Sequence, residues 1–371
     1  MFIEKISLEN FRNYERENFD LSKGRNVVFG ANAQGKTNFL EAVCFLAAAR
    51  SFRGAREQEM LRAGEQFASL EAEVALSDRK IVLRAEFERG RRRKLYLNRV
   101  KLKTAGEFTG NLRAVIFSPD DLTLVRGGAS ERRRFMDVAF SQLRPRYADC
   151  AARYSRLHEQ KTRLLRDYRE DPNLGGMLDA FNLQLAATGA AIVRYRAFFV
   201  RKMQKSASAL HDDISGGERL EMRYRTVSTI SDPYASEEEL KNRILEHMYS
   251  HRAAELASGQ ALSGPHRDDI ELLIDGLPAR SFASQGQART AALALKLAER
   301  ELMLSESGEE PVLLLDDVLS ELDSGRREFV INKLGGGQVI ITHCDPAALE
   351  GFGGRLFEID GGRIASQTTN R

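Results

Sequence analysis

The residues best suited to chemistry in this 371-residue chain form a glycine-rich octapeptide: Gly30, Ala31, Asn32, Ala33, Gln34, Gly35, Lys36 and Thr37. The pattern Gly-x-x-x-x-Gly-Lys-Ser/Thr predicts a phosphate-binding loop, because glycines let backbone N–H groups surround a β-phosphate. Lys36 would reach the β- and γ-phosphates of ATP, and the Thr37 hydroxyl would bind Mg²⁺. The alternative is a glycine-rich strand-to-helix turn that binds nothing.

A pair of acids is the expected partner of such a loop. Asp316 and Asp317 directly follow the apolar run at 312–315, which is typical of a buried strand. Asp316 would hold Mg²⁺ through water, and Asp317 would polarise the water that attacks the γ-phosphate. Alone, such a pair is often only a helix N-cap. After a phosphate-binding loop in the same chain, the catalytic interpretation is favoured.

A third element lies about 25 residues before the acidic strand, at the start of a long helix. Ser284 and Gln287 fit a capping box, which alone would explain both residues. An uncovered helix N-terminus with Ser284 and Gly286 at its tip is also an anion site. In ATPases of the ABC type, this helix start binds the γ-phosphate of a nucleotide held by a second subunit. The segments 320–323 and Thr342-His343 complete that arrangement, with His343 either a switch histidine or a simple strand-end residue.

The elements that position these residues follow from hydrophobic periodicity. A strand at 26–29 precedes the octapeptide, and from Thr37 the period changes to that of a helix of about three and a half turns. Proline and acids at 118–121 indicate a helix start. Further strands are expected at 2–9, 69–76, 80–87, 312–315 and 339–342, with helices to about 210 (broken at 172–176), at 285–305 and at 324–333, and a final hairpin around 360–362.

This order predicts an α/β fold, an ABC-type ATPase head with an inserted helical domain. We expect one lobe at 1–119 with the phosphate loop and an antiparallel meander. A mainly helical domain at 120–260 would contain a helical hairpin, reaching about 50 Å at 1.5 Å per residue. A second lobe at 261–371 would carry the helix start at Ser284 and the acidic strand.

Charge and composition limit the partners. The net charge is only +3, but residues 120–170 contain twelve Lys or Arg and eight Asp or Glu, and 89–94 is a second basic run. Either run could face nucleic acid or be a solvated surface. Three widely spaced cysteines indicate a reduced compartment. We found no signal-peptide pattern and no apolar run near the ~18 residues of a membrane span, so a cytoplasmic protein without a membrane partner is expected.

With these motifs in place, the sequence resembles the RecF family of bacterial DNA-repair ATPases over nearly its whole length. The segments that carry the resemblance are 8–14, 30–38, 49–53, 117–122, 132–135, 262–269, 283–290 and 313–323. The segments beginning at 117, 262 and 283 are the most diagnostic, because other ABC-type ATPases do not share them.

The resemblance implies an SMC-like head with a short helical domain in place of a long coiled coil. It implies an ATP-dependent homodimer on DNA, a preference for duplex beside single-stranded gaps, and slow hydrolysis that releases the dimer. It further implies work with RecR and RecO in loading recombinase, and links to replication and the SOS response. Arg12 occupies the position of an arginine near the nucleotide in SMC-like heads. Two departures are Asp317 in place of glutamate and the missing Q-loop glutamine, for which 118–121 is the candidate substitute.

Two other functions remain open on the sequence. An ABC-type ATPase could act as a nucleotide switch in another DNA complex or in a membrane complex, as transporter subunits do. A nuclease would need a metal cluster; the sequence offers none with metal spacing, His266 to Asp269 being the nearest candidate, so no nuclease activity is expected. A structural loop under the helix start at Ser284 is the other interpretation of that segment.

Overall fold

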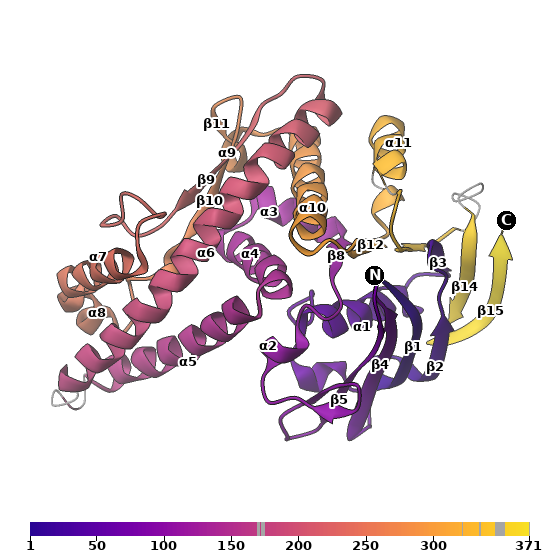
Figure 1. Cartoon of the computed structure of the whole chain (residues 1–371), viewed down its shortest axis with the longest axis horizontal. Helices are drawn as coiled ribbons and strands as arrows, with labels where there is room; N and C mark the ends of the chain where they lie inside the picture. Colours follow the sequence, from indigo (N-terminus) through magenta and orange to yellow (C-terminus); the bar gives the residue numbers. More distant parts are fainter. Residues whose placement is uncertain (169–170, 172–174, 321, 334, 346–352, 371) are drawn as a thin grey trace. The chain divides into compact units, whose positions relative to one another are not determined.

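The computed structural model describes residues 1–168, 171, 175–320, 322–333, 335–345 and 353–370. The chain forms two compact units (Figure 1). Unit 1 contains residues 1–121 and 292–371, and unit 2 contains 122–291. The mixed α/β character agrees with the expected fold class.

Unit 1 contains an antiparallel sheet in the order β2-β1-β4-β5-β6-β7. Strand β1 (Phe2–Phe11) is longer than expected, and β2 (Tyr14–Asp20) was missed because its sequence is mostly polar, with only Tyr14 and Phe19 buried. The meander is confirmed as β4 (Phe67–Ala75) and β5 (Lys80–Glu88). Smaller elements complete this part: η1 (Glu57–Met60), β6 (Lys94–Leu97), β7 (Val100–Lys101) and α2 (Ala105–Phe108).

The second sheet of unit 1 has the order β15-β14-β3-β13-β12-β8. All neighbouring pairs are parallel except β14 and β15. Its strands are β3 (Arg25–Phe29), β8 (Ala114–Phe117), β12 (Val312–Asp316), β13 (Val339–His343), β14 (Gly354–Asp360) and β15 (Arg363–Asn370). In such sheets ligands bind outside the carboxyl ends of the strands. The loops after β3, β12 and β13 are therefore the expected site.

Helix α1 (Lys36–Ala48) links the loop after β3 to the core. Its buried side chains join strand residues of both sheets in one hydrophobic cluster that includes Phe39, Phe45, Leu70, Leu314 and Phe357. The cluster includes Phe87, whose ring lies 4.9 Å from that of Phe45 between centroids. Burial of these aromatic rings anchors α1 against both sheets and so holds the loop before it in position.

Unit 2 is built around two long helices. Helix α5 (Pro145–Asp167) and helix α6 (Gly175–Ser215) run side by side as the expected hairpin (Figure 1). At 41 residues, α6 is about 60 Å long by the 1.5 Å rise, somewhat more than expected. Of the expected break at 172–176, residues 172–174 lie outside the described part. Further helices in this part of the chain are η2 (Pro119–Asp121, in unit 1), α3 (Leu122–Arg126), α4 (Ala129–Leu143), α7 (Glu237–Ser250) and α8 (Arg252–Ser258).

The boundary expected at residue 260 differs from the observed division after Ala291. Strand β10 (Asp269–Ile274) pairs with β9 (Leu220–Arg225), which ties 262–291 to the helical unit. This part also contains η4 (Pro265–Arg267), β11 (Leu277–Pro278) and α9 (Ala279–Phe282). Helix α10 (Gln285–Ser307) then begins in unit 2 and ends in unit 1.

Helix α6 also corrects the expectation about apolar runs. It contains an 18-residue window that is long and apolar enough to cross a membrane by length and composition. Half of that window is buried inside the structure, and α6 packs against α5, α7 and β9. The core helix of a globular unit satisfies the same criterion, so the window alone is weak evidence of a membrane span.

Candidate nucleotide-binding site

The glycine-rich octapeptide joins β3 to α1, in the context that the sequence predicted. Gly30 has a φ of +147°, and a Cβ there would lie 2.3 Å from the carbonyl oxygen of Ile359. Gly35 caps α1 with a φ of +124°, and a Cβ there would lie 2.8 Å from the side chain of Asn13. Both positions require glycine, because other residues combine strain with a steric clash.

The loop is held from outside by hydrogen bonds to Gln34 and Gly35. Asn13 donates from Nδ2 to the Gln34 carbonyl (2.7 Å), and the Tyr14 hydroxyl donates to the Gly35 carbonyl (3.0 Å). The turn between β14 and β15 adds the Gly361 N–H, which donates to Oε1 of Gln34 (2.6 Å). Sequence reasoning missed Asn13 and Tyr14 as supports, although both lie in the motif at 8–14.

Lys36 is nearly fully buried and points back over the loop. Its ammonium group donates to the carbonyl oxygens of Gly30 (2.6 Å) and Ala31 (2.9 Å). A cation held on two carbonyls that belong to the loop itself can turn toward phosphate oxygens with little loss of hydrogen bonding.

Asp316, at the end of β12, meets Thr37 directly. The Thr37 hydroxyl donates to Oδ1 of Asp316 (3.0 Å), and Thr342 on β13 donates to the same oxygen (2.8 Å). Burial raises the pKa of Asp316 and the neighbouring Asp317 charge adds to this effect, while the two hydroxyls oppose it. A hydroxyl beside a carboxylate is the kind of oxygen pair that Mg²⁺ prefers, so these residues fit that ion.

Asp317 follows with a left-handed backbone (φ +53°), a conformation that aspartate tolerates better than most residues. Its N–H donates to the Thr342 hydroxyl (3.0 Å). Its Oδ1 atom is buried and has no hydrogen-bond partner among the described residues. A buried carboxylate oxygen left unpaired beside the loop suits a residue that must hold a water molecule.

The end of β13 adds one predicted and one unpredicted residue. His343 is buried, and its Nδ1 accepts the Asp345 N–H (2.9 Å), which leaves Nε2 as the protonated nitrogen of a neutral ring. Cys344 was missed. Its thiol lies 2.9 Å from Oδ1 of Asn32, 3.5 Å from Nζ of Lys36 and 3.6 Å from Oδ2 of Asp317. The sequence feature that could have identified Cys344 is its position directly after the strand that forms β13, next to β3.

Arg12 forms a bidentate ion pair with the fully buried Glu41 of α1, at 2.8 Å from both Nε and Nη2. Its third contact, from Nη1 to the Glu59 carbonyl, measures 2.5 Å. The described contacts of the Arg12 guanidinium are therefore to protein groups, and its predicted role beside a nucleotide stays a prediction.

The helix start at Ser284 lies in unit 2 and forms the expected capping box. The Ser284 N–H donates to Oε1 of Gln287 (2.8 Å), and the Gln287 N–H donates to the Ser284 hydroxyl (3.1 Å). Gln287 is further held by Glu218 (2.8 Å), and Arg126 donates to the Ala283 carbonyl (2.9 Å). Ser284 and Gln285 are exposed, and Gly286 is half-buried. Of the predicted segment 320–323, residue 321 lies outside the described part.

The segment from His266 to Asp269 packs against the helices of unit 2. His266 pairs with the Tyr154 hydroxyl (2.8 Å), and Asp269 receives two hydrogen bonds from Arg132 (2.6 and 2.9 Å). Asp268 is fully buried and pairs with Tyr224 and with Arg196. Its contacts are thus to α4, α5, α6 and β9. These contacts suit the structural interpretation of the segment, but they are made to other elements than the helix start at Ser284 that the sequence analysis expected.

Comparisons with known proteins show which family the chain belongs to. The RecF/RecN/SMC N-terminal domain matches residues 2–355. The DNA replication and repair protein RecF of Acetivibrio thermocellus is 37% identical over 367 residues, covering 98% of this chain and 99% of that protein. That of Caldanaerobacter subterraneus subsp. tengcongensis is 35% identical, covering 95% and 96%.

Solved structures of similar proteins support the same family. The recombination mediator protein RecF of the RecFOR pathway, with ATPrS, superposes with a TM-score of 0.92 at 33% identity, covering 98% of this chain and 97% of that one. The corresponding RecF-ATP structure gives 0.91 at 32% identity, covering 100% and 98%. The Smc head domain of Pyrococcus furiosus, at 15% identity and a TM-score of 0.56, shares the fold. The chain belongs to the RecF family, within the ABC-type, SMC-like class of P-loop ATPase heads.

Proposed function

We propose that this chain is an ATP- and Mg²⁺-dependent DNA-binding ATPase that acts in recombinational gap repair, replication and SOS induction in the cytoplasm. The observation that carries the proposal is the meeting of Lys36, Thr37 and Asp316 at the carboxyl ends of β3 and β12. RecF relatives named for DNA replication and repair, and RecF structures with ATP and ATPrS, support it.

Each site residue of unit 1 has a proposed role in binding or hydrolysing ATP. Lys36 and the N–H groups of residues 30–37 hold the phosphates, with the α1 dipole adding to the attraction. Thr37 and Asp316 would hold Mg²⁺, and the ion would neutralise negative charge on the phosphates. Asp317 would orient the attacking water, and His343 at the end of β13 would contact the γ-phosphate. Asp317 is one methylene shorter than a glutamate and reaches less far toward the water, which suits slow hydrolysis.

The other half of the site comes from a second copy of the chain. Ser284, Gly286 and Gln287 form a helix start, exposed at Ser284, that suits the γ-phosphate of a nucleotide bound to the partner. ATP would then join two subunits on DNA, and hydrolysis would release them. At gaps, this dimer would cooperate with RecR and RecO to load recombinase; the RecFOR pathway is named for the related structures.

The test replaces Ser284 with arginine, which puts a bulky side chain at the helix start. Ser284→Arg should abolish ATP-dependent dimerisation and ATP-enhanced binding to gapped DNA while ATP binding to the monomer persists. The charge-matched control is Ser258→Arg, at an exposed position at the end of α8. ATP-dependent dimers of the Ser284→Arg variant at wild-type strength would refute the shared site.

A further inference from the structure

One face of α5 carries four exposed arginines, namely Arg146, Arg153, Arg156 and Arg163. At 100° per residue they fall within an arc of about 100°, and at 1.5 Å per residue they span roughly 26 Å. We call these four residues the α5 arginine stripe. A row of cations of this length matches about seven or eight steps of a DNA strand, whose phosphates are about 3.4 Å apart along the axis.

The arginine stripe is distinguished by its lack of ion pairs. No acid lies within 4 Å of these four guanidinium groups in the part of the chain that the structure describes. In the other basic run, 89–94, three of the five cations are paired: Arg91 and Lys94 with Glu88 (2.8 and 3.6 Å), and Arg93 with Glu57 (2.5 Å). Only Arg89 and Arg92 of that run have no ion pair among the described residues. Guanidinium groups already satisfied by carboxylates gain less from phosphates than groups that are still hydrated.

The arginine side chains of α4 also contact other protein groups. Arg132 is buried against Asp269, and Arg133 donates to the Asp268 carbonyl (2.7 Å). Of the basic residues at 120–170 that the sequence singled out, the members of the stripe are thus the better candidates. Three exposed acids, Asp149, Glu159 and Asp167, also lie on α5. At 100° per residue Asp149 and Asp167 fall within the arc of the stripe, so they reduce the positive charge there without reversing it.

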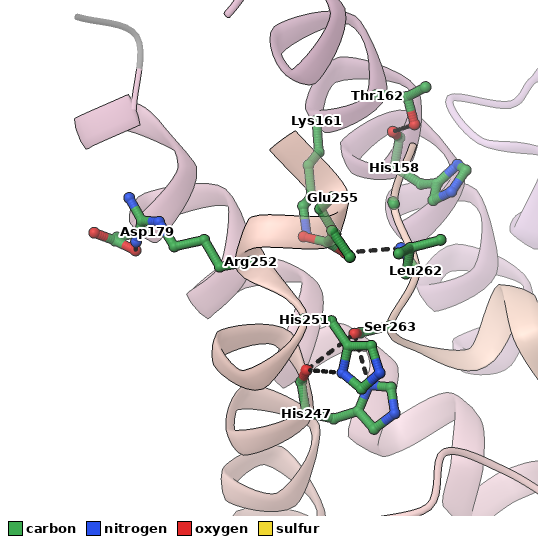
Figure 2. A network of polar contacts seen from close by, with 12 residues as sticks. His158, Lys161, Thr162, Asp179, His247, His251, Arg252, Glu255, Leu262 and Ser263 are labelled. Atoms are coloured by element: carbon green, nitrogen blue, oxygen red, sulfur yellow. Dashed lines mark hydrogen bonds and ion pairs between the residues drawn. The ribbon is translucent and has the colours of Figure 1, made fainter. Parts of the chain in front are cut away.

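The opposite face of α5 is anchored, which fixes the direction of the arginine stripe. Lys161 and Glu255 form a buried ion pair at 2.6 Å, and Oε1 of Glu255 accepts the Leu262 N–H at 2.7 Å (Figure 2). Burial lowers the pKa of Lys161, and Glu255 opposes that shift. Rotation of α5 about its axis would break this pair and leave a charge buried alone, so the arginines remain on the outside.

We infer that the α5 arginine stripe contacts the sugar–phosphate backbone of duplex DNA. This inference rests on the proposed DNA-binding function and assigns its location. Contacts of this kind are independent of sequence, and they release condensed counterions, so each contact steepens the dependence of affinity on salt. The stripe would position the duplex without selecting bases.

The test measures binding of full-length protein to a gapped duplex with ATP and Mg²⁺ over a series of salt concentrations. Arg153→Gln/Arg156→Gln/Arg163→Gln should lower the slope of log K against log salt by up to about 2.7, at 0.9 per lost contact. Affinity at 0.1 M salt should fall by about two orders of magnitude. The matching triple lysine variant should keep most of the slope, because lysine retains the charge.

Two controls separate this inference from the proposed function. Arg223→Gln/Arg225→Gln removes two exposed arginines of unit 2 that are paired with Glu221 and Glu271, and should leave the slope within about 0.5 of wild type. ATP-dependent dimerisation should survive in the triple variant. If the triple variant still dimerises and its salt slope is unchanged, the stripe does not contact DNA, while the proposed function is unaffected. This holds even if the variant loses binding to some other partner. A wild-type protein that does not bind gapped DNA would overturn both.

Discussion

The phosphate loop of unit 1 and the helix start at Ser284 in unit 2 both place a helix N-terminus where an anion could bind, yet their surroundings differ. Lys36 and Asp316 are 7% exposed and hydrogen-bonded to neighbouring groups. Ser284 and Gln285 are exposed, and Phe282 just before them is 66% exposed. The first region is organised within one chain. The second is exposed, which suits the half of a site that we propose a second subunit completes.

The largest expected effect comes from Lys36→Ala. Removing a cation that forms two loop hydrogen bonds should weaken ATP binding by at least about 100-fold, since hydrogen bonds to charged groups are worth roughly 1.5–3 kcal/mol. Titration calorimetry with a slowly hydrolysed ATP analogue measures this directly. Near-wild-type affinity would show that the nucleotide binds elsewhere and that the loop at 30–37 is not the nucleotide site.

Asp317→Asn should separate binding from hydrolysis. The amide keeps the shape of the side chain but cannot act as a base, so turnover should fall by about 100-fold or more. ATP binding and ATP-dependent dimerisation should remain, because the phosphate contacts belong to Lys36 and Thr37. Turnover within twofold of wild type would show that another group activates the water.

A stability difference should appear in unit 2 on acidification. Burial, with the nearby charge of His158, lowers the pKa of His266 to about 3. The unfolded chain, with a histidine pKa near 6.5, therefore binds more protons between pH 6.5 and 3. The stabilisation from neutral His266 is complete above pH 6.5 and is lost as pH falls, by at most about 1.4 kcal/mol per pH unit.

Hydrogen exchange of the α5 and α6 amides at pH 7 and pH 5, corrected for the intrinsic exchange rate, measures that effect. His266→Gln should flatten the pH dependence of protection while lowering protection at pH 7, because the pairing with Tyr154 is disturbed. Identical pH dependence in wild type and variant would mean that other groups carry it.

The smallest effect concerns the helix start itself. Gln287→Ala removes the side chain that caps the Ser284 N–H and contacts Glu218, and should destabilise unit 2 by about 1 kcal/mol. Gln285→Ala, two residues earlier in the first turn, should cost much less, since no hydrogen bond of its side chain is found among the described residues. Equal losses would show that the capping box does not hold this surface.

Local patterns predicted much of unit 1 from the sequence. The change of period at Thr37 located α1, and the apolar run before Asp316 located β12. Strand β2 escaped because only two of its seven residues are buried, so alternation is weak. Strand β10 follows the helical region and resembles the strands of the last third, and only its pairing with β9 assigns it to unit 2.

Contacts between distant residues could not be predicted in the same way. Glu41 is an unremarkable acid in the sequence, yet it is fully buried because Arg12 meets it 29 residues away. Lys161 belongs to the same basic region as Arg156 and Arg163 but is neutralised by Glu255. Sequence shows how much charge a segment carries, whereas the fold decides which charges remain available.

Mixing two inactive variants tests the central claim most directly. Lys36→Ala retains an intact Ser284, and Ser284→Arg retains an intact phosphate loop, so a dimer of one copy of each contains one complete site. The account predicts little ATP hydrolysis from either variant alone and recovery toward about a quarter of wild-type activity in an equal mixture, since random pairing gives half mixed dimers with one working site of two. Full hydrolysis by Ser284→Arg alone, with no gain on mixing, would contradict it.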